Sequence, residues 1–342
     1  MPPLQQTERS GQKCEYRSAP PLFRHVLACV GPSAGARQVL EQAIQIAEAT
    51  GGSLTALGVL PGRTPGGLAQ DPLDWDIARR AEMNRIRRLA GAACAPGSMQ
   101  TRVGCGPPAP VICEEGLRLK CDLAVLGTGA NGDMPGWGLG GTSRQVAERF
   151  PGSVLLVPRQ AANGAPLRQR ILVPHDGSTQ AEIARRIATR LALIRKAELV
   201  LVHALAPIVP LIDGPLGRDD ATILVKLRES AERQARERLD QVRRLIPAGD
   251  ISSRVRHLSG NDPRETLLGV LQEEQAELVV LSARGQGSNA DLAIGSTADY
   301  LLSRSTSPVL LVRPGLSPSE KEVVRPQQTA PRLAEPLAGY RH

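Results

Sequence analysis

Residues Glu277 to Pro314 read ELVVLSARGQGSNADLAIGSTADYLLSRSTSPVLLVRP and carry the clearest structural signal of the chain. The apolar run Leu278 to Leu281 is typical of a strand that is buried on both faces of a parallel sheet. A glycine-containing loop follows, and apolar residues then recur at helical spacing from Ser296, which we interpret as a helix cap. The run Val309 to Val312 predicts a further strand. The segment therefore predicts a strand, a loop, a helix and a strand in that order.

The loop between the first strand and the helix has the residues of an anion site. Successive backbone N–H groups in a glycine loop, together with a helix N-terminus, favour a phosphate. Gly285 and Gly295 would let the backbone approach such a ligand, and the Ser296 hydroxyl could donate to one of its oxygens. Ordinary loop glycines beside a helix cap are the alternative interpretation, and spacing alone does not separate the two.

The whole chain of 342 residues contains two copies of one alternating pattern, in which Val26 matches Ile171 and Gly127 matches Ser282. Strands that alternate with helices imply parallel sheets with right-handed crossovers. We therefore predict an α/β fold of two tandem Rossmann-like domains, each an open five-stranded, mostly parallel sheet with helices on both faces. The predicted strands are 23–30, 53–60, 100–103, 123–126 and 154–157, then 170–175, 197–204, 252–258, 278–281 and 309–312. The predicted helices are 37–49, 73–90 and 110–119, then 180–195, 223–245, 263–273 and one from 296.

Four segments follow from this pattern. Residues 22–160 and 168–314 are the two predicted domains, whereas 1–21 and 315–342 lack apolar periodicity and are predicted to be a disordered lead and tail. The last strand of each copy is apolar and edge-like. With the family resemblance described below, this implies that the two strands pair within the chain. A further homodimer is left open.

Composition limits the function classes. The formal charge of +8 would attract polyanions, but aromatic residues make up only 2% of the chain and arginines are spread among acids, so no nucleic-acid partner is expected. No apolar stretch is long enough to span a membrane and the first residues lack a signal-peptide core, which predicts a cytoplasmic protein without membrane insertion. The six cysteines lack metal-site spacing and are expected to be reduced.

The second copy resembles a universal stress protein domain. The family's glycine motif has the form G-x-x-G, nine residues, then G followed by S or T; here Ser282-Ala283-Arg284-Gly285 precedes nine residues and Gly295-Ser296, so only the first glycine departs. The opening Val173 to Ser178 (VPHDGS) and the pair Val202-His203 also resemble the family's first two strands.

This resemblance implies a site for ATP, with or without magnesium, in the second domain. The acid after the first strand would lie by the adenosine, and the residue after the second-strand histidine would border the base. Asp176 and Ala204 hold these positions, and the loop residues would hold phosphates and ribose. The complete set of expected site residues is Pro174, His175, Asp176, Ala204, Leu281, Ser282, Arg284, Gly285, Gly295, Ser296 and Thr297. His175 and His203 are expected to be hydrogen-bonded structural residues rather than catalysts.

The first copy departs further from the family. Gly31 replaces Asp176, Ala130 replaces a motif glycine, and Gly141 replaces the hydroxyl residue, so we interpret the first domain as degenerate. The sequence Gly127 to Gly132 (GTGANG) matches a dinucleotide fingerprint, but no helix follows at once and the match is weak.

Three functions remain open at this stage. The first is a nucleotide-binding regulatory protein in the stress response, in which ATP biases a surface read by a protein partner that the sequence does not identify. The second is an ATP-independent interaction scaffold built as an intrachain pseudo-dimer. The third is a slow ATPase, for which the sequence offers only Asp176 as a candidate acid or base.

Overall fold

The structure is a computed structural model, and the part of the chain that it describes begins at Pro21 and ends at Arg313. The expected lead and tail fall almost entirely outside the described residues, as does Ala130 to Gly132 of the dinucleotide-like motif. The described ranges are 21–62, 72–91, 94–95, 97–129, 138–159, 168–205, 218–246, 251–259, 262–285 and 292–313.

Strands and helices alternate in each half of the described chain, as the sequence pattern predicts. The first half contains β1 (His25–Cys29), α2 (Ala36–Thr50), β2 (Ser53–Leu60), α3 (Pro72–Ala90), β3 (Met99–Cys105), α4 (Pro108–Arg118), β4 (Leu123–Gly127), α5 (Gly141–Arg149) and β5 (Ser153–Val157). The second half contains β6 (Arg168–Pro174), α6 (Thr179–Arg195), β7 (Glu198–Leu205), α7 (Arg218–Arg244), β8 (Ser253–Ser259), α8 (Pro263–Glu274), β9 (Ala276–Ser282), α9 (Ser296–Arg304) and β10 (Val309–Val312).

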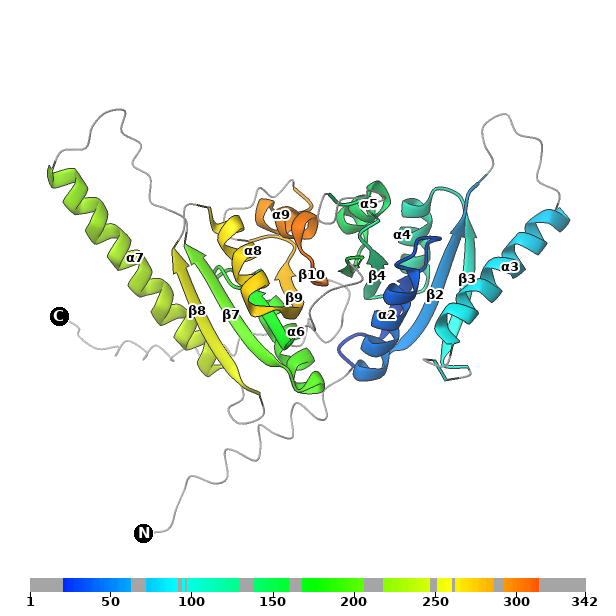
Figure 1. Cartoon of the computed structure of the whole chain (residues 1–342), viewed down its shortest axis with the longest axis horizontal. Helices are drawn as coiled ribbons and strands as arrows, with labels where there is room; N and C mark the ends of the chain where they lie inside the picture. The colour runs from blue at the N-terminus through cyan, green and yellow to red at the C-terminus, as the bar shows by residue number, and fades with distance from the viewer. Residues whose placement is uncertain are drawn as a thin grey trace, which may run out of the picture.

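The two halves share one ten-stranded sheet with the order β3-β2-β1-β4-β5-β10-β9-β6-β7-β8. All strand pairs within each half are parallel, and the two halves meet where β5 and β10 pair antiparallel, with Leu155 opposite Leu310. Figure 1 shows the resulting arrangement, with β5 and β10 near the middle and the long helices α3 and α7 at the two outer ends. The predicted fold class and the predicted pairing of the last strands are therefore confirmed.

Backbone hydrogen bonds repeat between the halves and fix which residues are equivalent. The amide of Val30 donates to the carbonyl of Leu57 (2.8 Å), and the amide of His175 donates to the carbonyl of Val202 (2.8 Å). Further along, the Gly140 amide donates to Thr128 (2.8 Å) and the Gly295 amide donates to Ala283 (2.8 Å). Gly31 is therefore the structural counterpart of Asp176, in agreement with the sequence match.

The core forms two layers, one on each face of the sheet. Successive strand residues point to opposite faces, so Leu310 belongs to the layer under α2, α3, α6 and α7, and Leu311 to the layer under α4, α5, α8 and α9. Each layer contains residues of both halves and is built largely from Leu, Val, Ile and Ala. The two halves therefore share a continuous core, which holds the carboxyl ends of the strands of each half in fixed positions.

Candidate functional site

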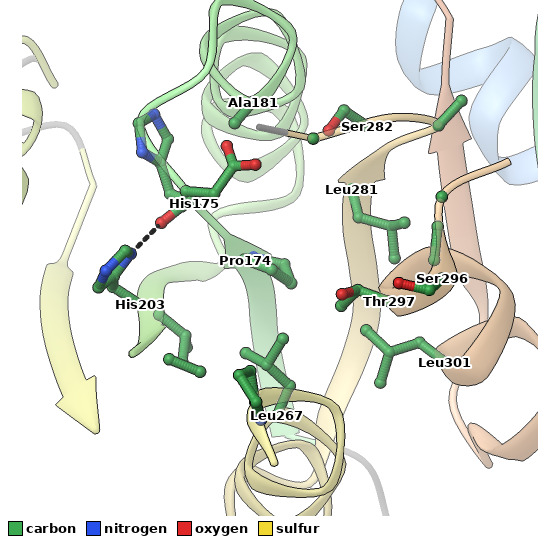
Figure 2. A pocket seen from close by; sticks show the side chains of 18 of the residues that line it. Pro174, His175, Ala181, His203, Leu267, Leu281, Ser282, Ser296, Thr297 and Leu301 are labelled. Carbon is green, nitrogen blue, oxygen red and sulfur yellow. Dashed lines mark hydrogen bonds between the residues drawn. The ribbon is translucent and has the colours of Figure 1, made fainter. Parts of the chain in front are cut away.

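A pocket of about 420 Å³ lies beyond the carboxyl ends of β6 and β9 in the second half. β6 is hydrogen-bonded to β7 on one side and to β9 on the other, so the crossover connections leave it in opposite directions. This is the switch point at which open α/β sheets bind ligands. Figure 2 shows side chains of β6, β7, β9, α8 and α9 converging on this pocket.

The pocket collects residues that the sequence places far apart. From the expected set, its lining includes Pro174, His175, Asp176, Ala204, Leu281, Ser282, Gly285, Gly295, Ser296 and Thr297. Arg284 is not part of this lining. Burial, and to a smaller extent the charge of Arg284, lower the pKa of the Arg313 guanidinium at the end of β10.

Asp176 and Gly285 are in close contact at the polar end of the pocket. The Oδ1 atom of Asp176 accepts a hydrogen bond from the Ser178 amide (2.9 Å), which fixes the carboxylate after β6. A Cβ atom built on Gly285 would lie 2.3 Å from Oδ2 of Asp176, far inside van der Waals contact. A side chain at position 285 would therefore have to move the Asp176 carboxylate from its present place.

The turn after β6 holds Asp176 through local sequence. Gly177 adopts φ +84°, a left-handed conformation that glycine allows without steric cost. Ser178 then caps α6, and its hydroxyl accepts a hydrogen bond from the Ala181 amide (3.1 Å). The Asp-Gly-Ser sequence thus turns the chain from strand to helix at the rim of the pocket.

The two histidines support the backbone around the pocket. The Nδ1 atom of His203 lies 2.7 Å from the His175 carbonyl and donates to it, as Figure 2 shows. The Nδ1 atom of His175 accepts from the Gly177 amide (3.2 Å), so the neutral ring carries its proton on Nε2, 3.7 Å from Glu182. Both histidines are therefore hydrogen-bonded to the backbone, as expected.

Glu182 anchors the first turns of α6 beneath His175. Its carboxylate accepts hydrogen bonds from Arg185 (2.5 and 2.8 Å) and Arg186 (3.2 Å). Burial by itself raises the pKa of Glu182, but the hydrogen bonds from Arg185 and Arg186, together with the nearby His175 ring, outweigh it and hold the pKa well below its usual value. A carboxylate with a lowered pKa stabilises the fold fully above its unfolded pKa and loses that contribution as the pH falls.

Substitution of Glu182 by glutamine should therefore reduce the free energy of unfolding by about 2 kcal/mol at pH 7. The difference from the wild type should shrink as the pH falls below 4.5, the usual value for glutamate, because the wild type then loses its own carboxylate contribution. Urea unfolding measured from pH 7 to pH 3 checks this. Glu41→Gln, which breaks an exposed pair with Arg37, is the control and should behave as the wild type. Parallel stability curves for the wild type and Glu182→Gln would contradict the assignment.

The start of α9 differs from the sequence prediction. Gly295 is the cap residue, with φ −72° and ψ 157°, and Ser296 is the first helical residue, so the interpretation of Ser296 as the cap is wrong. The reason is the bond from the Gly295 amide to the Ala283 carbonyl, which holds Gly295 in extended conformation. No side chain caps this helix, so the Ser296 and Thr297 hydroxyls are not used for capping. The helix N-terminus thus faces the pocket together with two hydroxyl residues.

Ser282, the departure from the family motif, does not strain the backbone. It is the last residue of β9 and pairs with Val312 of β10. It is also absent from the described non-glycine residues with positive φ. A glycine is therefore not required at this position.

The apolar end of the pocket was missed by the sequence reasoning. Pro263 and Leu267 of α8 line it, together with Val202, Leu292 and Leu301. Figure 2 places Leu267 and Leu301 on adjacent helices below the end of β6. The only sequence signal is Asp262-Pro263, which starts α8 with a capping bond from the Arg264 amide (2.8 Å). That signal predicts where the helix begins but not what its first turns contact.

The corresponding region of the first half is built differently. Gly31 and Gly58 take the places of Asp176 and His203. Two charged side chains of α3, Glu82 and Arg85, contact these glycines. Arg85 donates to the carbonyls of Val30 (3.2 Å) and Gly31 (3.1 Å). Glu82, paired with Arg85, packs so closely that a Cβ on Gly58 would lie 2.8 Å from its Oε1 atom. An ion pair of the chain itself thus lies beside the two glycines that replace Asp176 and His203.

The described residues also bear on metal binding, on the state of the cysteines and on membrane insertion. Within the described ranges, no group of three or more His, Cys, Asp or Glu side chains could hold a metal ion. The cysteines that the structure describes (Cys29, Cys94, Cys105, Cys113 and Cys121) are all free, as expected. None of the described helices is both long enough and apolar enough for a bilayer crossing.

The fold and the pocket together define a tandem α/β protein with a pocket of the kind that binds small ligands in its second half. The model of the universal stress protein family matches residues 22–158 and again residues 168–313. The chain therefore belongs to the universal stress protein family, with two such domains in tandem.

Each similarity to an individual relative extends over only part of this chain and part of the relative. A universal stress protein of Mycolicibacterium smegmatis is 30% identical over 42% of this chain and 47% of its own length. One of Mycobacterium tuberculosis is 29% identical over 57% of this chain and 62% of its own length. The chain thus matches less than two thirds of either relative. A crystal structure of a universal stress protein from Archaeoglobus fulgidus shares the fold, with a TM-score of 0.57 at 20% identity over 85% of this chain and 98% of that one.

Proposed function

We propose that the second domain binds ATP in the pocket between β6, β9 and α9, and that the protein acts as a nucleotide-dependent regulator rather than as an enzyme. The observation that carries this proposal is the meeting of Asp176, Gly285 and the first turn of α9 around one pocket. The volume of 420 Å³ falls in the range of small-molecule sites.

The two ends of the pocket fit the two ends of an adenine nucleotide. Pro263, Leu267 and Leu292 offer an apolar surface for a base. The backbone at Gly285 and the N-terminus of α9 offer amide donors and partial positive charge for phosphates. Asp176 lies between β6 and this loop, where its carboxylate can accept a hydrogen bond from a ribose hydroxyl.

The number of carboxylates in the pocket lining bears on how a magnesium ion would be bound. Asp176 is the only carboxylate in the lining of this pocket as described. Magnesium is commonly held by one or two carboxylates together with substrate phosphates. The ion would therefore enter with the triphosphate, and the backbone donors of the protein would still contact the remaining phosphate oxygens.

Titration calorimetry with ATP tests the proposal. The wild type should show saturable binding at one site per chain, and Asp176→Ala should weaken the affinity about tenfold, or about 1.4 kcal/mol. Gly31→Ala changes the equivalent residue of the first domain, where a Cβ meets nothing within 4 Å, and should bind ATP as the wild type does. Equal affinity in Asp176→Ala would exclude the assigned role of the carboxylate.

An ATP-independent scaffold is the second candidate, and the shared ten-stranded sheet favours it. The same titration separates the two, because a scaffold would show no saturable binding of ATP. A slow ATPase would bind ATP and also release phosphate faster than a Gly295→Val control, which disrupts the start of α9.

A further inference from the structure

Strand β3 leaves one edge of the sheet open. Within the described part of the chain, β3 is the outermost strand at its end of the sheet and is hydrogen-bonded only to β2. Figure 1 shows β3 beside α3 at one end of the molecule, far from the second domain. An outermost strand presents N–H and C=O groups that can pair with another extended chain.

A groove surrounds this edge. It has a volume of about 500 Å³ and is lined by residues of α3, β3 and α4. Arg79, Met83 and Arg87 recur every fourth residue along α3, so they share one helix face. Arg102 and Met99 of β3 complete a surface that combines guanidinium groups with apolar side chains.

Positive charge exceeds negative charge in the groove. Its lining contains Arg79, Arg87 and Arg102, but only one acid, Glu115, among the described residues. Glu115 is shared, since it pairs with Arg118 and lies 4.0 Å from Arg102. Arg79 pairs with an aspartate of its own helix, whereas Arg87, which is exposed, makes no ion pair within the described ranges. The groove therefore retains cationic groups that can contact a ligand.

The opposite end of the sheet provides an internal comparison. Arg256 of β8 pairs with Val202 as Arg102 of β3 pairs with Leu57, so the two arginines are equivalent. Glu274, whose side chain is only 5% exposed, binds Arg170, Arg254 and Arg256, and further carboxylates come from Glu198 and Glu273. The edge at β8 is thus neutralised by its own acids, whereas the edge at β3 is not.

We propose that the open edge of β3 is a docking surface for an acidic, extended segment of a protein partner. The segment would add to the sheet as a further strand, so that its backbone pairs with β3. On one face of that strand its carboxylates would contact Arg102, and on the other face its alternate side chains would cover Met83 and Met99 beside Arg87. The excess of arginine over acid at this edge selects an acidic partner, and the pairing of backbones selects an extended one.

The experiment uses a short fluorescein-labelled peptide that alternates glutamate and valine, with fluorescence anisotropy on the full chain. The wild type should bind it saturably, and Arg87→Glu combined with Arg102→Glu should weaken binding by at least about tenfold. Arg228→Glu makes the same charge change at a 60% exposed arginine of α7 and should leave binding unchanged. Equal binding by the double variant and the wild type would overturn the proposal.

Two further probes of the wild type keep the test decisive even if the double variant fails to fold. The same peptide with every backbone amide N-methylated has no N–H group to donate to β3 from either edge, so its binding should be lost. If it binds as well as the parent peptide, strand addition is excluded. An oligothymidylate of similar charge should bind more weakly than the peptide. Tighter binding of the oligothymidylate would overturn the proposal and indicate that the partner of this surface is a nucleic acid.

Discussion

Replacement of Gly285 by valine is expected to abolish ATP binding, with a loss of affinity of at least about 100-fold. The reason is steric and local. A Cβ atom at position 285 would lie 2.3 Å from the Asp176 carboxylate, so the valine must move either the loop or the acid. Both belong to the proposed site, and titration calorimetry of the variant with ATP measures the loss.

Gly141→Val is the matched control for this variant. Gly141 is the first residue of α5 and is equivalent to Ser296 of α9, but a Cβ there meets nothing within 4 Å. This variant should bind ATP with the affinity of the wild type. If Gly285→Val also retained that affinity while remaining folded, the contact between Asp176 and residue 285 would have no part in binding.

Replacement of Leu310 by aspartate is expected to have the largest effect on stability. Leu310 is fully buried at the centre of the antiparallel pair that joins the two domains, opposite Leu155. A carboxylate there would lose its hydration without gaining a partner, at a cost of at least about 4 kcal/mol in unfolding free energy. Thermal unfolding should show a strongly lowered melting temperature, and aggregation should follow from the exposed strand edges.

Leu245→Asp serves as the reference substitution, because Leu245 is 60% exposed after the end of α7. It should change the melting temperature little. A Leu310→Asp protein that remained soluble and melted like Leu245→Asp would show that β5 and β10 do not form the buried junction.

The sequence was sufficient to predict most of the fold because the central strands are short apolar runs that are buried on both faces. The strands Ser53–Leu60 and Val309–Val312 begin and end where the pattern predicts. Helix ends were less accurate where backbone contacts from elsewhere intervene. α7 begins at Arg218, before the predicted Ile223, because the polar residues Arg218 to Asp220 carry no apolar signal from which a helix start could be predicted.

The candidate site was only partly predictable. The motif residues that follow strands, such as Asp176 and Gly285, lie in the pocket because parallel strands bring their carboxyl ends to one edge. Arg284 lies outside the lining, since a residue within a loop can point either way and spacing does not determine which. The apolar wall from α8 depends on how that helix packs over the sheet, which no local pattern encodes.

The grouping of arginines in the first domain could not be predicted from the sequence alone. In a helix with mixed charges, Arg79 and Arg87 read as ordinary solvated residues. Only the placement of α3 beside Arg102 of β3, with Glu115 as the sole acid in the described lining, shows that positive charge gathers at the open edge. The charge pattern of a surface depends on tertiary neighbours, so it appears only in the folded chain.

A crystal structure of the full chain grown with millimolar ATP and magnesium shows whether the second domain holds the nucleotide. We expect electron density for adenine against Pro263 and Leu267, and for the phosphates over the amides at Gly285 and the first turn of α9. Density for the pocket residues with no nucleotide between them, at saturating ATP, would contradict this expectation.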